Sequence, residues 1–116
     1  MEIKLDELDE LDDGIVKVLL SGRMDIVGTS DIDLKFAAVT NGDYQKVLVD
    51  MSEVSFIASI GMRTLLSSAK SATQKGNKIV LANCQPLVQE ALETAGIDTL
   101  IPMFQSIEAA ITSLNS

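Results

Sequence analysis

Histidine is absent from the 116 residues of this chain. Without an imidazole the chain can build neither a Ser-His-Asp nor a Cys-His catalytic set, and transition-metal sites lose their commonest ligand. The pattern G-x-x-x-x-G-K-(S/T) is missing as well, so no P-loop is predicted. We therefore expect no catalytic residue, no metal and no cofactor, and an enzyme or nucleotide-binding domain is the least favoured of three functional hypotheses.

Cysteine is represented once, by Cys84, which excludes an intrachain disulfide and fits a reducing compartment. Such a cysteine is more often a small core residue than a reactive thiol. No apolar run approaches the roughly 18 residues of a membrane helix, and the acidic N-terminus does not resemble a signal peptide. We expect a cytoplasmic protein.

Positive charge is also scarce, with 9 Lys and Arg against 17 Asp and Glu and a net charge of −8. A phosphate backbone requires a basic footprint, and 3% aromatic residues offer little for base stacking. Neither nucleic acid nor an anionic membrane is therefore an expected partner. A basic protein surface is the natural electrostatic complement.

Short runs of apolar and β-branched residues predict five strands. The first pairs Ile3 and Leu5, with Leu8 as a possible continuation, and a loop from Asp9 to Gly14 follows. The other four runs are residues 15–20, 47–49, 78–82 and 100–101. The strand at residues 47–49 is expected to end at Asp50, and the strand at residues 100–101 is interrupted by Pro102.

Four segments combine helical spacing with a start signal. The starts are Ser30 with Asp33 in a capping-box position, then Ser59, Pro86 and Ser106, and residues 22–28 are expected to form a loop before the first helix. The order ββαβαβαβα predicts an α/β fold, with a mostly parallel central sheet, an N-terminal β-hairpin and helices mainly on one face. Length predicts one domain spanning residues 1–116.

Ser59 lies where an extended segment ends and helical spacing begins, with Met62 and Leu65 on one helix face. The first N–H groups of a helix have no internal partners, and the helix dipole places partial positive charge there. A serine at that point can act as the N-cap, and a phosphate on its oxygen would be well accommodated.

Residues 50–63, D-M-S-E-V-S-F-I-A-S-I-G-M-R, resemble the signature of the STAS domain, and in particular that of the anti-sigma-factor antagonists. In that family a partner kinase phosphorylates the serine before x-Gly, which corresponds to Ser59 followed by Gly61. Residues 22–25 and 95–97 resemble two weaker family motifs, so the similarity spans essentially the whole chain. Ala58 stands where many members have an acidic residue, and Ile60 where a second Ser or Thr is frequent.

The resemblance implies a single non-enzymatic STAS domain that binds an anti-sigma serine kinase when unphosphorylated. Phosphorylation of Ser59 would release the kinase, and a separate phosphatase would reset the switch. The expected partner surface comprises Asp25, Ala58, Ser59, Ile60, Gly61, Met62 and Arg63. The second hypothesis is a STAS interaction module in another phosphorylation-controlled signalling or scaffold assembly, not acting on a sigma factor.

Several of these residues also have purely structural interpretations. Gly61 is costly early in a helix, so it indicates either close packing or space beside bare amides. Asp25 is either a loop or capping carboxylate or part of the partner surface, and Asp50 is expected to bond turn amides near Ser52. Met62 is of a type that is usually core. Arg63 is expected to be solvated, and alternative phosphoacceptors are Ser52, Ser55, Thr29 and Ser30.

Overall fold

The computed structural model describes residues 1–7, 14–42 and 44–116. Its elements are β1 (Glu2–Glu7), β2 (Ile15–Met24), α1 (Ile26–Thr40), β3 (Lys46–Ile57), α2 (Ser59–Gln74), β4 (Lys78–Ala82), α3 (Pro86–Thr94), the 3₁₀ turn η1 (Ile97–Thr99), β5 (Met103–Phe104) and α4 (Ile107–Leu114). Apart from the short 3₁₀ turn, this is the predicted order. The proposed continuation of the first strand at Leu8 and residues 9–13 of the following loop lie outside the described residues.

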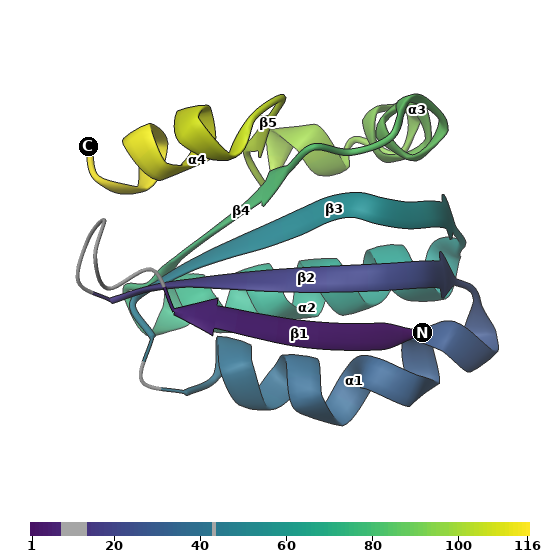
Figure 1. Ribbon diagram of the computed structural model, residues 1–116, viewed down its shortest axis with the longest axis horizontal. Helices are drawn as coiled ribbons and strands as arrows, with labels where there is room; N and C mark the ends of the chain where they lie inside the picture. Colours follow the sequence, from purple (N-terminus) through teal and green to yellow (C-terminus); the bar gives the residue numbers. More distant parts are fainter. Residues whose placement is uncertain (8–13, 43) are drawn as a thin grey trace.

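The five strands form one sheet in the order β1-β2-β3-β4-β5. β1 runs antiparallel to β2, and the β2–β3, β3–β4 and β4–β5 pairs are parallel. The predicted hairpin and the mostly parallel sheet are both confirmed. Because parallel strands point the same way, the segments that follow β2 and β3 leave the sheet at the same edge, on the right of Figure 1.

The alternation of side chains along the central strands divides the apolar residues between two faces. Val16 of β2 and Val47 of β3 contribute to the larger core cluster, whereas Leu48, the next residue of β3, contributes to the smaller one. Buried residues of α1, α2 and α3 join the larger cluster, whereas Ala110 and Leu114 of α4 join the smaller one. Helices therefore lie mainly on one face, as predicted, and α4 covers the other. Figure 1 shows α4 and α1 at opposite sides of the molecule.

Two predicted boundaries were wrong at the edge where β2 and β3 end. The first helix begins at Ile26 with Asp25 as its N-cap, not at Ser30, and residues 22–24 belong to β2 rather than to a loop. β3 does not stop at Asp50 but continues to Ile57. In both cases the parallel pairing of β2 with β3 extends as far as Met24 opposite Ile57, and this pairing holds the backbone extended where local sequence favoured a break.

The last strand was also misplaced, at residues 100–101. β5 is Met103–Phe104, directly after Pro102, whose carbonyl accepts a hydrogen bond from the Leu81 N–H at 2.9 Å. The helix starts at Pro86 and Ser106 are confirmed, and the Ser106 hydroxyl accepts from the Ala109 N–H at 3.0 Å. Among the described residues, no helix is both long and apolar enough to cross a membrane.

Candidate functional site

Ser59 is the first residue of the 16-residue helix α2, and its side chain is exposed. The residue expected as the N-cap was wrong by one position. Ala58 is the cap, because its carbonyl accepts from the N–H groups of Gly61 and Met62 at 3.0 and 3.1 Å. Alanine supplies no side-chain acceptor, so the first turn of α2 has no side-chain cap. The Ser59 hydroxyl therefore stands at a helix N-terminus whose amides still favour an anion.

The paired ends of β2 and β3 fix this helix start. Met24 and Ile57 are neighbours in the sheet, and the Ala58 N–H donates to the Met24 carbonyl at 3.0 Å. Asp25 follows Met24 directly, as Ser59 follows Ala58. The structure therefore brings together, at one edge of the sheet, two residues that lie 34 positions apart in the sequence.

Gly61 is buried where α2 passes closest to the end of β2. A Cβ atom at this position would lie 2.8 Å from the Met24 Cβ, 3.0 Å from the Ile57 Cγ1 and 3.1 Å from the Met24 carbonyl oxygen. The close-packing interpretation of this glycine is therefore the one that the geometry supports. Its small size keeps the N-terminus of α2, and with it Ser59, against the strand ends.

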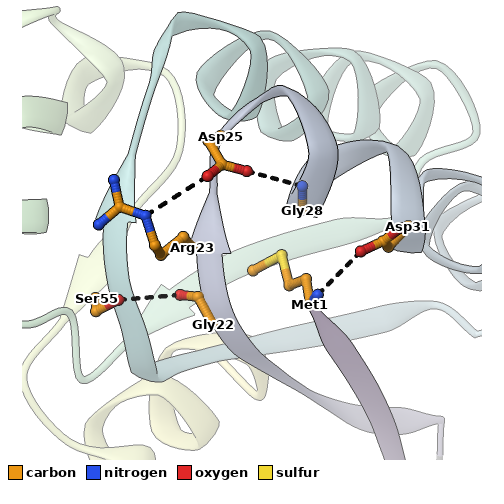
Figure 2. A network of polar contacts seen from close by, with 7 residues as sticks. All are labelled: Met1, Gly22, Arg23, Asp25, Gly28, Asp31 and Ser55. Carbon is orange, nitrogen blue, oxygen red and sulfur yellow. Dashed lines mark hydrogen bonds and ion pairs between the residues drawn. The ribbon is translucent and has the colours of Figure 1, made fainter.

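Asp25 is a capping carboxylate, one of the structural roles expected for it. Its Oδ1 accepts from the Gly28 N–H at 2.8 Å, and its Oδ2 lies 3.5 Å from the Arg23 Nε (Figure 2). The hydrogen bond from Gly28, followed by the interactions with Arg23, lowers the pKa of Asp25 against a smaller opposing effect of desolvation. This carboxylate is thus held ionised at the edge that carries Ser59.

Gly28 was predicted only as a loop residue and proves essential to this cap. A Cβ there would lie 1.9 Å from the Arg23 carbonyl oxygen, so no larger residue fits without moving the chain. The spacing of Asp25 and Gly28, an N-cap type followed by glycine three residues later, was the available signal. It competed with Ser30 and Asp33, which offered an equally good local pattern.

Arg23 packs against its cross-strand neighbour Phe56. The guanidinium carbon lies 4.3 Å from the ring centroid, a cation–π geometry, and Phe56 is partly exposed. Beside it the Ser55 hydroxyl donates to the Gly22 carbonyl at 3.5 Å (Figure 2). These contacts order the surface next to Asp25, and neither Arg23 nor Phe56 was among the expected site residues.

Two apolar residues at the start of α1 were also missed. Ile26 and Val27 follow Asp25 and are 73% and 71% exposed. Large apolar side chains that are exposed together are typical of contact surfaces. Sequence alone gave no sign of this exposure, because the segment was expected to be a loop.

The remaining expected site residues have different environments. Ile60 is half-buried and Arg63 exposed, and both line a groove of about 300 Å³ that also includes Asp33 and Ala37 of α1. Met62 is partly buried and packs on the larger core cluster, as its residue type suggested. Of the alternative phosphoacceptors, Ser30, Ser52 and Ser55 are exposed, whereas Thr29 is only 2% exposed.

Two further residues of the sequence analysis lie elsewhere in the fold. Asp50 lies within β3, and Cys84 follows the end of β4. The Asp50 Oδ1 accepts from the Ser52 N–H at 3.0 Å, which confirms the predicted bond although β3 continues through both residues. Cys84 is partly buried, and desolvation, followed by the charge of Asp50, raises the pKa of its thiol to about 11. The thiol therefore stays protonated at neutral pH.

No group of three or more His, Cys, Asp or Glu side chains in the described part of the chain is placed to hold a metal ion. What the site offers chemically is an exposed hydroxyl at a helix N-terminus. The paired ends of β2 and β3 also carry an ionised carboxylate and an arginine stacked on an aromatic ring, and two exposed aliphatic side chains follow at the start of α1. These features suit contact with another macromolecule and modification of the hydroxyl.

Comparison with known proteins identifies the family to which this domain is similar. Residues 8–110 match the family model of the STAS domain. BtrV of Bordetella bronchiseptica, a candidate anti-sigma factor antagonist, is 26% identical over 116 residues, which cover 100% of this chain and 97% of BtrV.

Two solved structures share the fold. An anti-sigma factor antagonist from Mycobacterium paratuberculosis has a TM-score of 0.87 at 19% identity, with 99% of this chain and 94% of that one covered. The Bacillus cell fate determinant SpoIIAA, in its phosphorylated form, has a TM-score of 0.70 at 19% identity, with coverage of 97% and 98%. The architecture is thus that of a small α/β domain with a mixed five-stranded sheet. The chain belongs to the STAS domain family.

Proposed function

We propose that this chain is an anti-sigma-factor antagonist, a single STAS domain over residues 1–116 that acts in the cytoplasm by partner switching. Unphosphorylated, it binds an anti-sigma serine kinase. The kinase phosphorylates Ser59 and is released, and a separate phosphatase removes the phosphate. The chain itself performs no catalysis and uses no cofactor. The descriptions of BtrV and of the Mycobacterium paratuberculosis protein support this assignment.

The exposed hydroxyl of Ser59 at the start of α2 is the observation that carries the proposal. A phosphate there adds about 1.5 to 2 negative charges at a helix terminus that tolerates anions, so the fold is expected to survive. SpoIIAA, which shares this fold, has itself been solved in a phosphorylated form.

The effect on a docked partner is different. Asp25, held ionised by Gly28 and Arg23, already carries negative charge near Ser59, and Ile26 beside it offers an apolar contact. A new dianion in such an interface loses its hydration without a matched countercharge, at a cost of several kcal/mol. Since 1.4 kcal/mol corresponds to a factor of ten, phosphorylation would weaken binding by about a hundredfold or more.

The test uses the purified anti-sigma serine kinase of the host, with binding measured by calorimetry and phosphorylation sites mapped by mass spectrometry. Ser59→Asp is expected to bind at least about a hundredfold more weakly than wild type, and Ser59→Ala to bind normally but resist ATP-driven release. Thr112→Asp, at an exposed position of α4 on the other face of the sheet, is the matched control and should bind as wild type does. Absence of phosphate transfer to Ser59, or unchanged binding of Ser59→Asp, would refute the switch.

A second candidate rests on Ala58. The N-cap of α2 is uncharged and makes no side-chain hydrogen bond, whereas many members of the family have an acidic residue there. A partner adapted to alanine points to a STAS interaction module in another phosphorylation-controlled assembly that does not act on a sigma factor. Identification of the protein that co-purifies from the host separates the two, since this candidate requires a partner without a sigma factor among its own ligands.

A further inference from the structure

Charge is distributed very unevenly along this acidic chain. The 36 residues from Val54 to Gln89 contain Arg63, Lys70, Lys75 and Lys78 but no Asp or Glu, although the whole chain carries a net charge of −8. This segment spans α2 and β4. Although the rest of the chain is strongly acidic, this segment is locally cationic and can attract negative charge.

A groove lies along the C-terminal half of α2, at the far end of the helix from Ser59. It has a volume of about 380 Å³ and is lined by Leu66, Ala69, Lys70, Thr73, Gln74 and Leu100. The α2 residues of this set recur at intervals of three and four and so share one face of the helix. Leu100, which follows η1, forms the opposite wall and is 66% exposed.

A second groove, of about 400 Å³, shares Ala69, Thr73 and Leu100 with the first. It extends the surface to Lys78 at the start of β4, whose Nζ donates to the Ser116 backbone oxygen at 3.0 Å. Among the described residues, neither groove is lined by an Asp or Glu side chain. The combined surface, called the α2–Leu100 groove below, is therefore lined by apolar residues, among them Leu66 and Leu100, together with Lys70 and Lys78.

We propose that the α2–Leu100 groove binds an acidic, apolar segment of a protein partner. Leu66 and Leu100 would contact apolar side chains of that segment, and Lys70 and Lys78 would attract its carboxylates. A lipid surface is disfavoured because the net charge of −8 repels anionic headgroups. An acidic peptide is small enough to lie within about 8 Å, one screening length, of Lys70, so the local positive charge acts on it more strongly than the distant acidic residues do.

This second surface is separate from the one proposed for the kinase. Lys70 lies eleven residues after Ser59, which is about 16 Å along a helix with a rise of 1.5 Å per residue. That separation exceeds the screening length of about 8 Å at physiological ionic strength, so phosphate on Ser59 should leave the groove unaffected. The inference thus holds whether or not Ser59 is a phosphorylation site, and the groove could keep the domain attached to an assembly while its other partner dissociates.

The experiment uses the full chain and two fluorescein-labelled synthetic peptides of equal composition, measured by fluorescence anisotropy. One peptide places leucines on one face of a helix with glutamates beside them, and the other is its scrambled version. Wild type is expected to bind the ordered peptide about tenfold more tightly, and Lys70→Glu or Leu100→Gln to remove that difference. A peptide with lysines in place of the glutamates should prefer Lys70→Glu to wild type.

Matched controls separate this groove from general charge and apolarity. Lys35→Glu on α1 and Leu87→Gln on α3, where Leu87 is 77% exposed, make the same chemical changes elsewhere and should bind the ordered peptide as wild type does. Ser59→Asp should also leave this binding unchanged. If Ser59→Asp bound the kinase as tightly as wild type does, this would therefore count against the phosphorylation switch but not against peptide binding in the groove.

Several outcomes would overturn the proposal. One is equal affinity for the ordered and scrambled peptides, and another is equal loss of binding in the control variants. A dimer in sedimentation that Leu100→Gln disrupts would assign the groove to a second copy of the chain. Co-sedimentation with phosphatidylserine vesicles that Lys70→Glu abolishes, without peptide binding, would assign it to a membrane.

Discussion

Replacing Gly61 by alanine is expected to destabilise the protein although it removes a glycine from a helix. At an unconstrained interior position the change would stabilise by up to about 1 kcal/mol, because alanine is the better helix former. Here the added methyl carbon would lie 2.8 Å from the Met24 Cβ and 3.1 Å from the Met24 carbonyl oxygen. Neither atom is the free end of a flexible side chain, and that carbonyl already accepts from the Ala58 N–H.

Overpacking costs about 1–3 kcal/mol, and contacts this short with atoms that cannot easily move place Gly61→Ala in the upper part of that range, at about 2–3 kcal/mol. After the gain in helix propensity the expected net loss is about 1–2 kcal/mol. Unfolding entropy scales with chain length, and for 116 residues this loss corresponds to a fall in Tm of about 4–8 °C. Circular dichroism melting and urea denaturation of wild type and Gly61→Ala measure it. Because the strain falls between the start of α2 and the end of β2, we expect binding of the kinase to weaken as well.

Ser67→Ala is the control for helix propensity, since Ser67 is exposed on the same helix. It should leave Tm unchanged or raise it slightly. A Gly61→Ala protein as stable as wild type, or more stable, would contradict the packing argument. In that case the glycine would have to be explained by access to the helix N-terminus.

Two further predictions concern titratable groups. The lowered pKa of Asp25 means that its ionised form stabilises the fold at pH values above 3.8, the ordinary pKa of this group. This contribution disappears as the pH falls through the lower pKa of the folded state. Asp25→Asn retains a capping oxygen but not the charge. Its Tm deficit at pH 7 should therefore shrink on acidification toward pH 3, and a deficit independent of pH would contradict this assignment. With its pKa raised to about 11, Cys84 should react slowly with iodoacetamide at pH 8 in the native state and rapidly in urea. Asp50→Asn should speed the native reaction, because it removes the second cause of the shift, and rapid labelling of folded wild type would show the thiol to be ionised.

The sequence by itself determined the order of the elements and the position of the serine. The apolar runs at residues 15–20 and 78–82 and the start signals at Pro86 and Ser106 are local properties, and strands and helices form there, although β2 extends beyond the predicted end. The change from extended to helical periodicity likewise placed Ser59 at the start of a helix, to within one residue.

Tertiary contacts decided where those elements begin and end. Ser30 was predicted as the cap of the first helix, but Asp25 is the cap, because β2 remains paired with β3 through Met24 and the helix begins directly after it. For the same reason β3 continues past Asp50, and the cap of α2 shifts to Ala58. Strand pairing depends on residues some 30 positions away, which no local pattern contains.

The two surfaces to which function is assigned also required the tertiary structure. The exposure of Ile26 and Val27 follows from the early start of α1 at the edge of the sheet. The α2–Leu100 groove exists only because the segment after α3 returns to lie beside α2. Sequence supplied the hydroxyl and the lysines, but only packing between distant segments determined which apolar side chains surround them.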